Sequence, residues 1–194
     1  MYYDKIVNGR FIERPNRFVA RVEIDGRVET VHVKNTGRCK ELLRKGAAVY
    51  LESCDTTARS TAFDLVAVEK GSRLINMDSQ APNRAAGEWL LKRELFPELI
   101  RMKPETKYGN SRFDFYVETP EEKIFIEVKG VTLEKEGVVL FPDAPSDRAV
   151  KHVEELTAAR REGYRAFVLF VIQMENVKYF TPNTETHPEF AEAL

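Results

Sequence analysis

The stretch 112–129, RFDFYVETPEEKIFIEVK, decides how the second half of the chain folds. Apolar and polar residues alternate on both sides of a four-residue loop at 119–122, which is the pattern of two β-strands joined as a hairpin. A hairpin that is symmetric about this loop places Asp114 directly opposite Glu127. Lys129 follows one pleat further along the same face of its strand. The sequence therefore predicts two acids and one lysine at one place on a sheet.

Two carboxylates that face each other across a strand pair repel by roughly 0.2–1 kcal/mol, so we expect a compensating charge. A bound Mg²⁺ or Mn²⁺ would supply it, because hard cations take carboxylate and carbonyl oxygens as ligands. The alternative is a solvated pair on an exposed strand face, neutralised by Lys129 and Arg112. A slip of one residue in the register would separate the two acids and remove the argument.

Helices are predicted on both sides of this hairpin in the chain. The first begins at Asn83, which is expected to cap it, and stops before Pro97. The second begins after Ser146, a plausible cap, and ends near Gly163. The apolar run 164–172, YRAFVLFVI, is typical of a central strand covered on both faces. With one more strand ahead of the hairpin, the order is α–β–β–β–α–β, a mixed sheet with flanking helices.

Glu88 is the third candidate acid. It lies on the first predicted helix and shares a face with Leu91 and Leu95. A carboxylate on a leucine stripe is costly unless it lies at a boundary or binds something. If this helix packs over the sheet, Glu88 would reach the same cation; the alternative is a boundary glutamate with its carboxylate in water.

The first 77 residues are predicted to be β. The segment 18–24, FVARVEI, alternates, and Asp25-Gly26 after it is a signal for a two-residue hairpin turn. Further short strands follow in the segments RVETVHV, AAVYLES, FDLVAVE and SRLINM. Five short strands in a row indicate a small barrel or curled sheet. The composition changes near 80–83, so we expect an α+β chain with domains at 1–80 and 81–194.

Composition places the chain among ordinary globular proteins. Of its 194 residues, 31% are charged and 43% hydrophobic, and no apolar run reaches the length of a membrane span. The N-terminus has no secretory signal, so a cytoplasmic protein without a membrane partner is expected. Cys39 and Cys54 lack the spacing of a zinc site and are interpreted as reduced thiols.

Basic residues concentrate near the N-terminus. Residues 10–45 hold ten Lys and Arg against five Asp and Glu, which favours a polyanion partner, nucleic acid above all. The alternative is a set of solvated strand faces, and for His152 a bland position at a helix boundary. The candidate nucleic-acid contacts are Arg17, Arg21, Lys34, Asn35, Arg38, Lys40, Lys107, Arg112, Lys151 and His152.

The Asp, Glu-x-Lys pattern with a helix Glu before it resembles the PD-(D/E)XK restriction-endonuclease-like superfamily, with Phe113 where proline is usual. A narrower resemblance is to the sugar fermentation stimulation protein A family. It extends over roughly 10–175 and rests on seven segments in the family's order: RFVARVEIDG, NTGRCKELL, QAPNRAAGEWL, KYGNSRFDF, FIEVKGVTL, FPDAPSDRAVKHVEEL and FVIQ.

This resemblance implies a five-stranded OB-fold barrel followed by a restriction-endonuclease-like mixed sheet flanked by helices. It implies DNA binding and a regulatory role in sugar metabolism. Carried over by motif, the catalytic positions are Glu88, Asp114, Glu127 and Lys129, and the metal ligands are Asp114, Glu127, the Val128 carbonyl and Glu88. Nuclease-like folds often dimerise to cut both strands, so a homodimer is an expectation as well.

Three departures from the family pattern stand out. Cys39 replaces the usual methionine, Met174 follows FVIQ where arginine is common, and the chain ends at HPEFAEAL, where the family continues.

Two functions follow from these features. The leading hypothesis is a DNA-binding protein with a Mg²⁺-dependent phosphodiesterase site. The alternative is a non-catalytic DNA-binding regulator of sugar metabolism genes that keeps a vestigial site. An enzyme acting on small phosphorylated or sugar ligands is disfavoured, because the chain has no Gly-rich phosphate loop.

Overall fold

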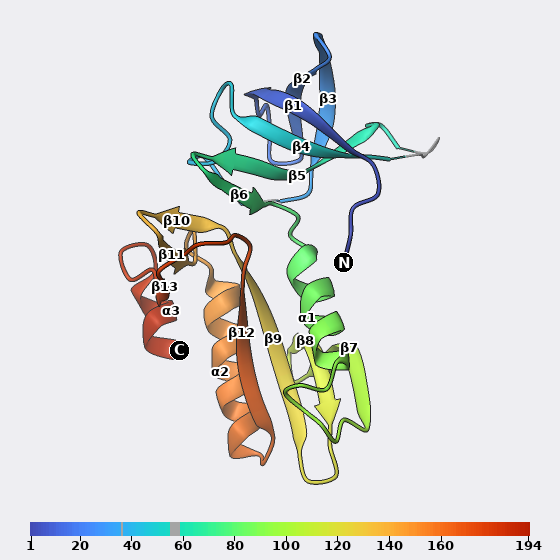
Figure 1. Ribbon diagram of the computed structural model, residues 1–194. Coiled ribbons are helices and arrows are strands. Elements are labelled where there is room, and N and C mark those ends of the chain that lie inside the picture. The colour runs from blue at the N-terminus through green and yellow to red at the C-terminus, as the bar shows by residue number, and fades with distance from the viewer. Residues whose placement is uncertain (36, 55–58) are drawn as a thin grey trace.

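The computed structural model describes residues 1–35, 37–54 and 59–194, which form a barrel followed by a unit of sheets and helices (Figure 1). Its first sheet has the strand order β3-β2-β1-β4-β5-β6, and a parallel pairing of β3 with β5 closes β1–β5 into a five-stranded barrel. The strands are β1 Ile6–Glu13, β2 Val19–Ile24, β3 Arg27–Val33, β4 Ala48–Ser53, β5 Phe63–Lys70 and β6 Arg73–Asn76.

The predicted barrel is confirmed, with one exchange of strands. Strand β1 was missed, because its apolar residues fall in the adjacent pairs Ile6-Val7 and Phe11-Ile12 and do not alternate with polar ones; only Phe11 is buried. Strand β6, which was counted in the barrel, pairs with β5 and extends the sheet beyond it, and its Ile75 forms an isolated antiparallel bridge with Met174. The predicted turn at Asp25-Gly26 is present, and its φ angles of 49° and 76° are the positive values that such a turn requires.

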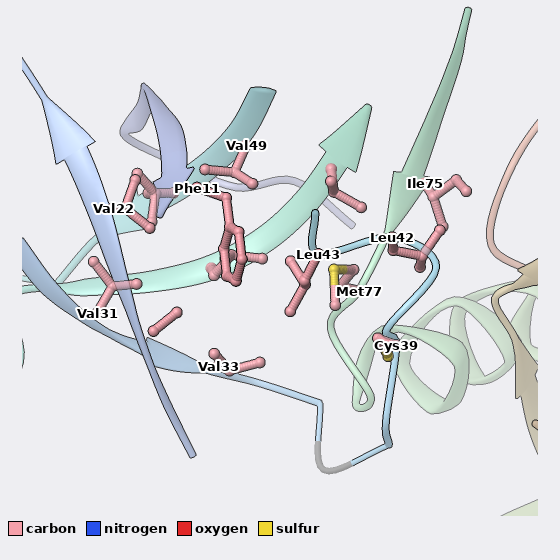
Figure 2. Close-up of a cluster of buried hydrophobic side chains, with 14 of the residues drawn as sticks. Phe11, Val22, Val31, Val33, Cys39, Leu42, Leu43, Val49, Ile75 and Met77 are labelled. Carbon is pink, nitrogen blue, oxygen red and sulfur yellow. The ribbon is translucent and has the colours of Figure 1, made fainter. Parts of the chain in front are cut away.

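The barrel core contains apolar side chains from the strands and from two connecting segments (Figure 2). Phe11, Val22 and Val31 come from the first three strands, whereas Leu42 and Met77 come from the connections. Cys39 is buried beside them as a free thiol, and burial raises its pKa to about 12. Such a thiol stays protonated and unreactive at neutral pH, as expected of a structural cysteine.

The second unit is built on a four-stranded sheet of order β12-β9-β8-β7, in which β12 runs parallel to β9. A smaller sheet of order β10-β11-β13 lies beside it. The elements are α1 Ala81–Leu91, β7 Arg101–Tyr108, β8 Ser111–Glu118, β9 Lys123–Val131, β10 Leu133–Lys135, β11 Val138–Phe141, α2 Asp147–Arg161, β12 Arg165–Ile172, β13 Tyr179–Pro182 and α3 Pro188–Ala193.

Helices α1 and α2 cover opposite faces of the larger sheet. Ile124 and Ile126 of β9 pack in the cluster that includes α1, whereas Phe125 between them packs in the cluster that includes α2. The predicted alternation holds in β9, whose Phe125 faces α2. It breaks in β8, where Phe113 packs with Phe125 on the α2 side while Phe115 packs on the α1 side. Leu91 and Leu95 are 59% and 41% exposed, so the expected leucine stripe does not form the buried face of α1.

Some predicted elements of this unit are confirmed and others are wrong. Ser146 caps helix α2 as predicted, because its hydroxyl accepts a hydrogen bond from the Ala149 N–H. Gly163 follows the end of the helix with a φ of 92°. The run 164–172 was predicted to be a central strand, yet β12 lies at the edge of the sheet and is half-buried after its first residue. Strand β9 is the buried central strand instead. The small sheet of β10, β11 and β13 was not predicted.

Barrel and second unit meet at a polar junction around Asp78. The side-chain amide of Gln173 donates to the backbone carbonyls of Asn76 and Asp78 at 3.1 and 3.2 Å. The backbone carbonyl of Gln173 accepts from the Asn76 N–H at 2.9 Å. Gly130 lies against Gln173 so closely that a Cβ atom there would lie 2.4 Å from the amide oxygen. The junction thus ties the barrel to the end of strand β9.

Candidate active site

The hairpin register agrees with the prediction. Phe115 pairs with Ile126, and Val117 pairs with Ile124. Beyond Phe115 the strand pairing gives way to a side-chain contact, in which Asp114 Oδ2 accepts a hydrogen bond from the Val128 N–H at 2.7 Å. Asp114 and Glu127 therefore belong to one site. They do not lie on an exposed strand face, as the simpler alternative required, because only 4% of Glu127 is exposed.

Asp114 is held by two donors and is nevertheless short of positive charge. Its Oδ1 accepts from the Asn83 side-chain amide at 2.6 Å, and its Oδ2 accepts from Val128. Burial raises the pKa of Asp114, and the negative charge of Glu127 raises it further, while the two hydrogen bonds and Lys129 act in the opposite direction. Burial first, and the charge of Glu127 second, thus disfavour the ionised form of Asp114.

Glu127 uses its two oxygens unequally. Its Oε1 accepts from Lys129 Nζ at 2.6 Å and lies 2.5 Å from His152 Nδ1. Its Oε2 is buried and has no hydrogen-bond partner among the described residues. A buried carboxylate oxygen without a partner costs free energy, and in a folded protein such an atom calls for a bound ligand, water or ion.

These groups fit a hard divalent cation. In an extended strand the N–H and C=O of one residue point to the same edge, so the Val128 carbonyl faces strand β8 as its N–H does. Within the described ranges, no three His, Cys, Asp or Glu side chains form a ready-made ligand set. Two carboxylates and one carbonyl suit Mg²⁺, which usually keeps several waters and takes further ligands from phosphate.

The backbone of β7 is irregular opposite this site. Pro104 pairs with Phe115 and Thr106 pairs with Phe113, so Glu105 lies across from Asp114. Glu105 has a φ of 51°, a left-handed conformation that non-glycine residues rarely adopt. Backbone strain of this kind costs roughly 1–3 kcal/mol and clusters at functional sites.

The structure does not bring Glu88 to the pair. Its carboxylate accepts from the amino-terminal ammonium of Met1 at 2.6 Å, and its side chain is 55% exposed. The residue of α1 that reaches Asp114 is Asn83, which was expected to cap the helix. The cap position is instead occupied by Gln80, because Pro82 lies in the first turn. This preference of proline was the signal that could have placed Asn83 inside the helix.

His152 is a second correction. The sequence left open whether its side chain contacts nucleic acid or is a bland residue at a helix boundary, and the structure shows it buried and bound to Glu127. The buried positions of α2 are Ala149, His152, Val153, Leu156 and Ala159. Their helical spacing includes position 152, so the histidine lies on the buried face of α2. Sequence reasoning also missed Arg148, whose Nε lies 3.4 Å from His152 Nε2.

The other candidate nucleic-acid contacts divide by exposure. Lys34 is bound to Asp78 at 3.0 Å and is mostly buried, and the Asn35 side chain accepts from the Gly37 N–H. Neither side chain is free for a ligand. The residues that remain exposed are Arg17, Arg21, Arg38, Lys40, Lys107, Arg112 and Lys151. Of these, Arg21 pairs with Glu13, Arg112 with Glu105 and Lys151 with Glu155.

Basic side chains line a groove next to the acid pair. The groove has a volume of about 700 Å³ and begins at the start of α2. Arg112, Arg148 and Lys151 supply its positive charge, and His152 lies at its wall. The loop that carries Arg38 approaches the segment ahead of α2, because a Cβ atom at Gly37 would lie 3.0 Å from an Asp143 oxygen. Positive charge from both units therefore lies on the side of the molecule where α2 begins.

In the part of the chain that the structure describes, no helix is long and apolar enough to span a bilayer.

Comparison with known proteins places the two units in one family. The model of the sugar fermentation stimulation protein N-terminal OB domain matches residues 12–77, and that of the RE domain matches residues 80–194. A sugar fermentation stimulation protein homolog of Ruminiclostridium cellulolyticum is 58% identical over 194 residues, which is all of this chain and 86% of that protein. The homolog of Caldanaerobacter subterraneus is 50% identical over 97% of this chain and 83% of its own length.

A solved structure of SfsA from Pyrococcus furiosus in complex with Ca²⁺ superimposes with a TM-score of 0.86 at 31% identity, and the match covers all of this chain and 84% of the other. The predicted OB barrel and the family resemblance are thereby confirmed. The chain belongs to the sugar fermentation stimulation protein family.

Proposed function

We propose that this protein binds nucleic acid, DNA foremost, and hydrolyses its phosphodiester bonds at Asp114, Glu127 and Lys129 with Mg²⁺ or Mn²⁺. The observation that carries the proposal is the unpartnered, buried Oε2 of Glu127 beside a second carboxylate whose pKa is raised. The arrangement also matches the spacing of the PD-(D/E)XK superfamily. Stability alone does not explain such an acid pair, because replacing one of the two charged groups with a neutral one would stabilise the fold.

Asp114, Glu127 and the Val128 carbonyl would hold the cation. When bound, it would polarise a phosphoryl oxygen and lower the pKa of a coordinated water. The Ca²⁺ named for the relative from Pyrococcus furiosus is a hard cation that prefers the same oxygen ligands. Mg²⁺ and Mn²⁺ are the cations that we expect to support hydrolysis here.

Lys129 supplies the positive charge of the site. Its side chain is only 12% exposed, and its Nζ is fixed 2.6 Å from Glu127. A buried ammonium held in place can orient an attacking water or stabilise negative charge that develops on the phosphate, at no cost of reorganisation. Asn83 holds Asp114 in position from the opposite helix.

The nucleic acid would follow the exposed basic residues. Arg112 and Lys151 line the groove beside the acid pair, and the barrel contributes further arginines and lysines. OB-fold barrels bind single strands through a positive groove combined with aromatic stacking. Binding carried by such contacts weakens steeply as salt displaces the protein from phosphate.

Binding is tested by fluorescence anisotropy with labelled single- and double-stranded DNA and RNA over a range of salt. We expect the logarithm of the affinity to fall linearly with the logarithm of the salt concentration. A double variant with Arg112→Ala and Lys151→Ala should bind more weakly, and its affinity should depend less steeply on salt. Lys135→Ala is the matched control, because Lys135 is exposed and lies in the small sheet. Equal affinity of the double variant and the control would remove the groove from the proposal.

Hydrolysis is tested on the same substrates with Mg²⁺ and Mn²⁺. Wild type should cleave, and Glu127→Gln should lose activity by about 10²-fold or more, because a group essential to transition-state stabilisation is removed. Glu121→Gln is the control, because Glu121 is exposed in the loop of the same hairpin. DNA binding without cleavage under any condition would favour the alternative, a non-catalytic regulator of sugar metabolism genes.

A further inference from the structure

Two side chains of α2 form a chain of hydrogen bonds that ends on Glu127. The exposed Arg148 lies one helical turn before the buried His152, and Arg148 Nε lies 3.4 Å from His152 Nε2. His152 Nδ1 lies 2.5 Å from Glu127 Oε1, and both of these side chains are 5% exposed. The proposed catalytic mechanism uses neither Arg148 nor His152.

The chemistry of the partners fixes where the imidazole proton lies. A guanidinium only donates, so His152 Nε2 must accept from Arg148. The ring proton is then on Nδ1, from which His152 donates to Glu127. The Phe113 ring packs against the imidazole at a centroid distance of 6.0 Å with an interplanar angle of 82°, which limits how the ring can turn.

This donor determines which oxygen of Glu127 stays open. Oε1 receives both His152 and Lys129, whereas Oε2 receives no described donor. With Oε1 engaged twice, the carboxylate cannot rotate to exchange its two oxygens without breaking both bonds. Partners of this kind orient metal ligands, and their removal typically lowers metal affinity 10–100-fold.

We propose that His152 is a positioning residue that holds Glu127 with Oε2 open for the cation, and that Arg148 sets the tautomer in which it does so. The inference rests on the proposed function, because it assumes that a cation binds at Glu127. It adds a link from the basic groove to the metal site, since Arg148 lines the groove that a phosphate would enter.

The test measures Mn²⁺ affinity by electron paramagnetic resonance in the full chain. We expect His152→Leu to bind Mn²⁺ about 10–100-fold more weakly than wild type. His152→Asn should stay within about threefold of wild type, because its side-chain amide offers a donor close to the place of Nδ1. Arg148→Ala, a change at an exposed position, should weaken binding less than His152→Leu does.

A second readout reports the proton directly. The chain has three histidines, so ring ¹⁵N spectra of labelled protein can be assigned by variants. We expect the Nδ1–H tautomer for His152 in wild type and a mixture of tautomers in Arg148→Ala. An Nε2–H tautomer in wild type, or full Mn²⁺ affinity in a folded His152→Leu, would overturn the inference. Absence of Mn²⁺ binding to wild type would instead refute the proposed function, and with it this role of His152.

Discussion

Two acidic sites of this protein are built in opposite ways. One is Asp78 at the junction, and the other is the pair of Asp114 and Glu127 in the second unit. Asp78 is fully buried and has both oxygens engaged: Lys34 lies 3.0 Å away, Arg84 is in contact, and the Gln80 N–H donates at 2.9 Å. At the other site two carboxylates share one lysine, and one oxygen of Glu127 has no described partner.

The difference separates structural charge from functional charge. A buried carboxylate that is bound by two cationic side chains is typical of a group that holds two segments of a chain together. A buried pair of carboxylates with too few cations is destabilising on its own account, and such sites are kept when they bind something. Variants that change one site and spare the other test this distinction.

The largest effect is expected from Asp78→Ala. The change leaves Lys34 and Arg84 without their partner at the junction, and breaking a buried ion pair in this way costs about 3 kcal/mol. Urea unfolding should show a matching fall in the free energy of unfolding. Glu127→Gln provides the contrast, with a change near zero, since a glutamine oxygen still accepts from Lys129. A loss of similar size in both variants would contradict the distinction.

Gly130→Ala tests the packing at the junction between the barrel and the second unit. The new Cβ would meet Gln173 Oε1 at 2.4 Å and Pro82 at 2.7 Å, so the junction must shift. Overpacking of this kind costs about 2 kcal/mol. Thermal unfolding measures the loss, and a Gln173→Ala background should reduce it, because the closest atom is then absent. An unchanged melting temperature in Gly130→Ala would show that the junction yields easily.

Asp114→Asn is expected to stabilise the protein at neutral pH by about 0.5–2 kcal/mol, as is common when a site charge is removed. The pKa of Asp114 is raised in the folded state, so its protonated form is favoured there. The Asp114 carboxyl therefore contributes stability at pH values below the pKa that it has in the unfolded chain. This contribution is lost as the pH rises through the higher pKa that it has in the folded protein.

The gain of Asp114→Asn should therefore be largest near pH 7 and shrink as the pH falls toward 4. Parallel urea titrations of wild type and variant at several pH values measure it. A gain that grows on acidification would mean that the folded protein favours the charged form of Asp114.

The smallest effect is expected far from both sites, at the barrel turn. Gly26 has a φ of 76° and open space around its Cα, so Gly26→Ala costs only the left-handed backbone conformation, about 1 kcal/mol. Its cation and DNA binding should equal those of wild type. A change in either would show that the barrel turn is coupled to the acid pair.

The sequence predicts the hairpin well because its information is local. Alternation and loop length alone fix the register from Phe115–Ile126 to Glu118–Lys123. The barrel follows from the same alternation and from the Asp25-Gly26 turn, except for β1, whose apolar residues do not alternate with polar ones.

What the sequence left open depends on contacts between distant elements. That Asn83 holds Asp114, and that His152 holds Glu127, is set by how α1 and α2 pack on the sheet. No spacing within one segment encodes these contacts. For the same reason Glu88 was expected at the acid pair although it binds the amino terminus of Met1.

The most direct test of the central claim is a calorimetric titration of Mn²⁺ into wild type, Glu127→Gln and Glu121→Gln. We expect one cation per chain for wild type and for Glu121→Gln, because Glu121 is an exposed loop residue, and a loss of binding for Glu127→Gln. Absence of binding to wild type, or equal binding to all three proteins, would contradict the claim that the unsatisfied acid pair is a cation site.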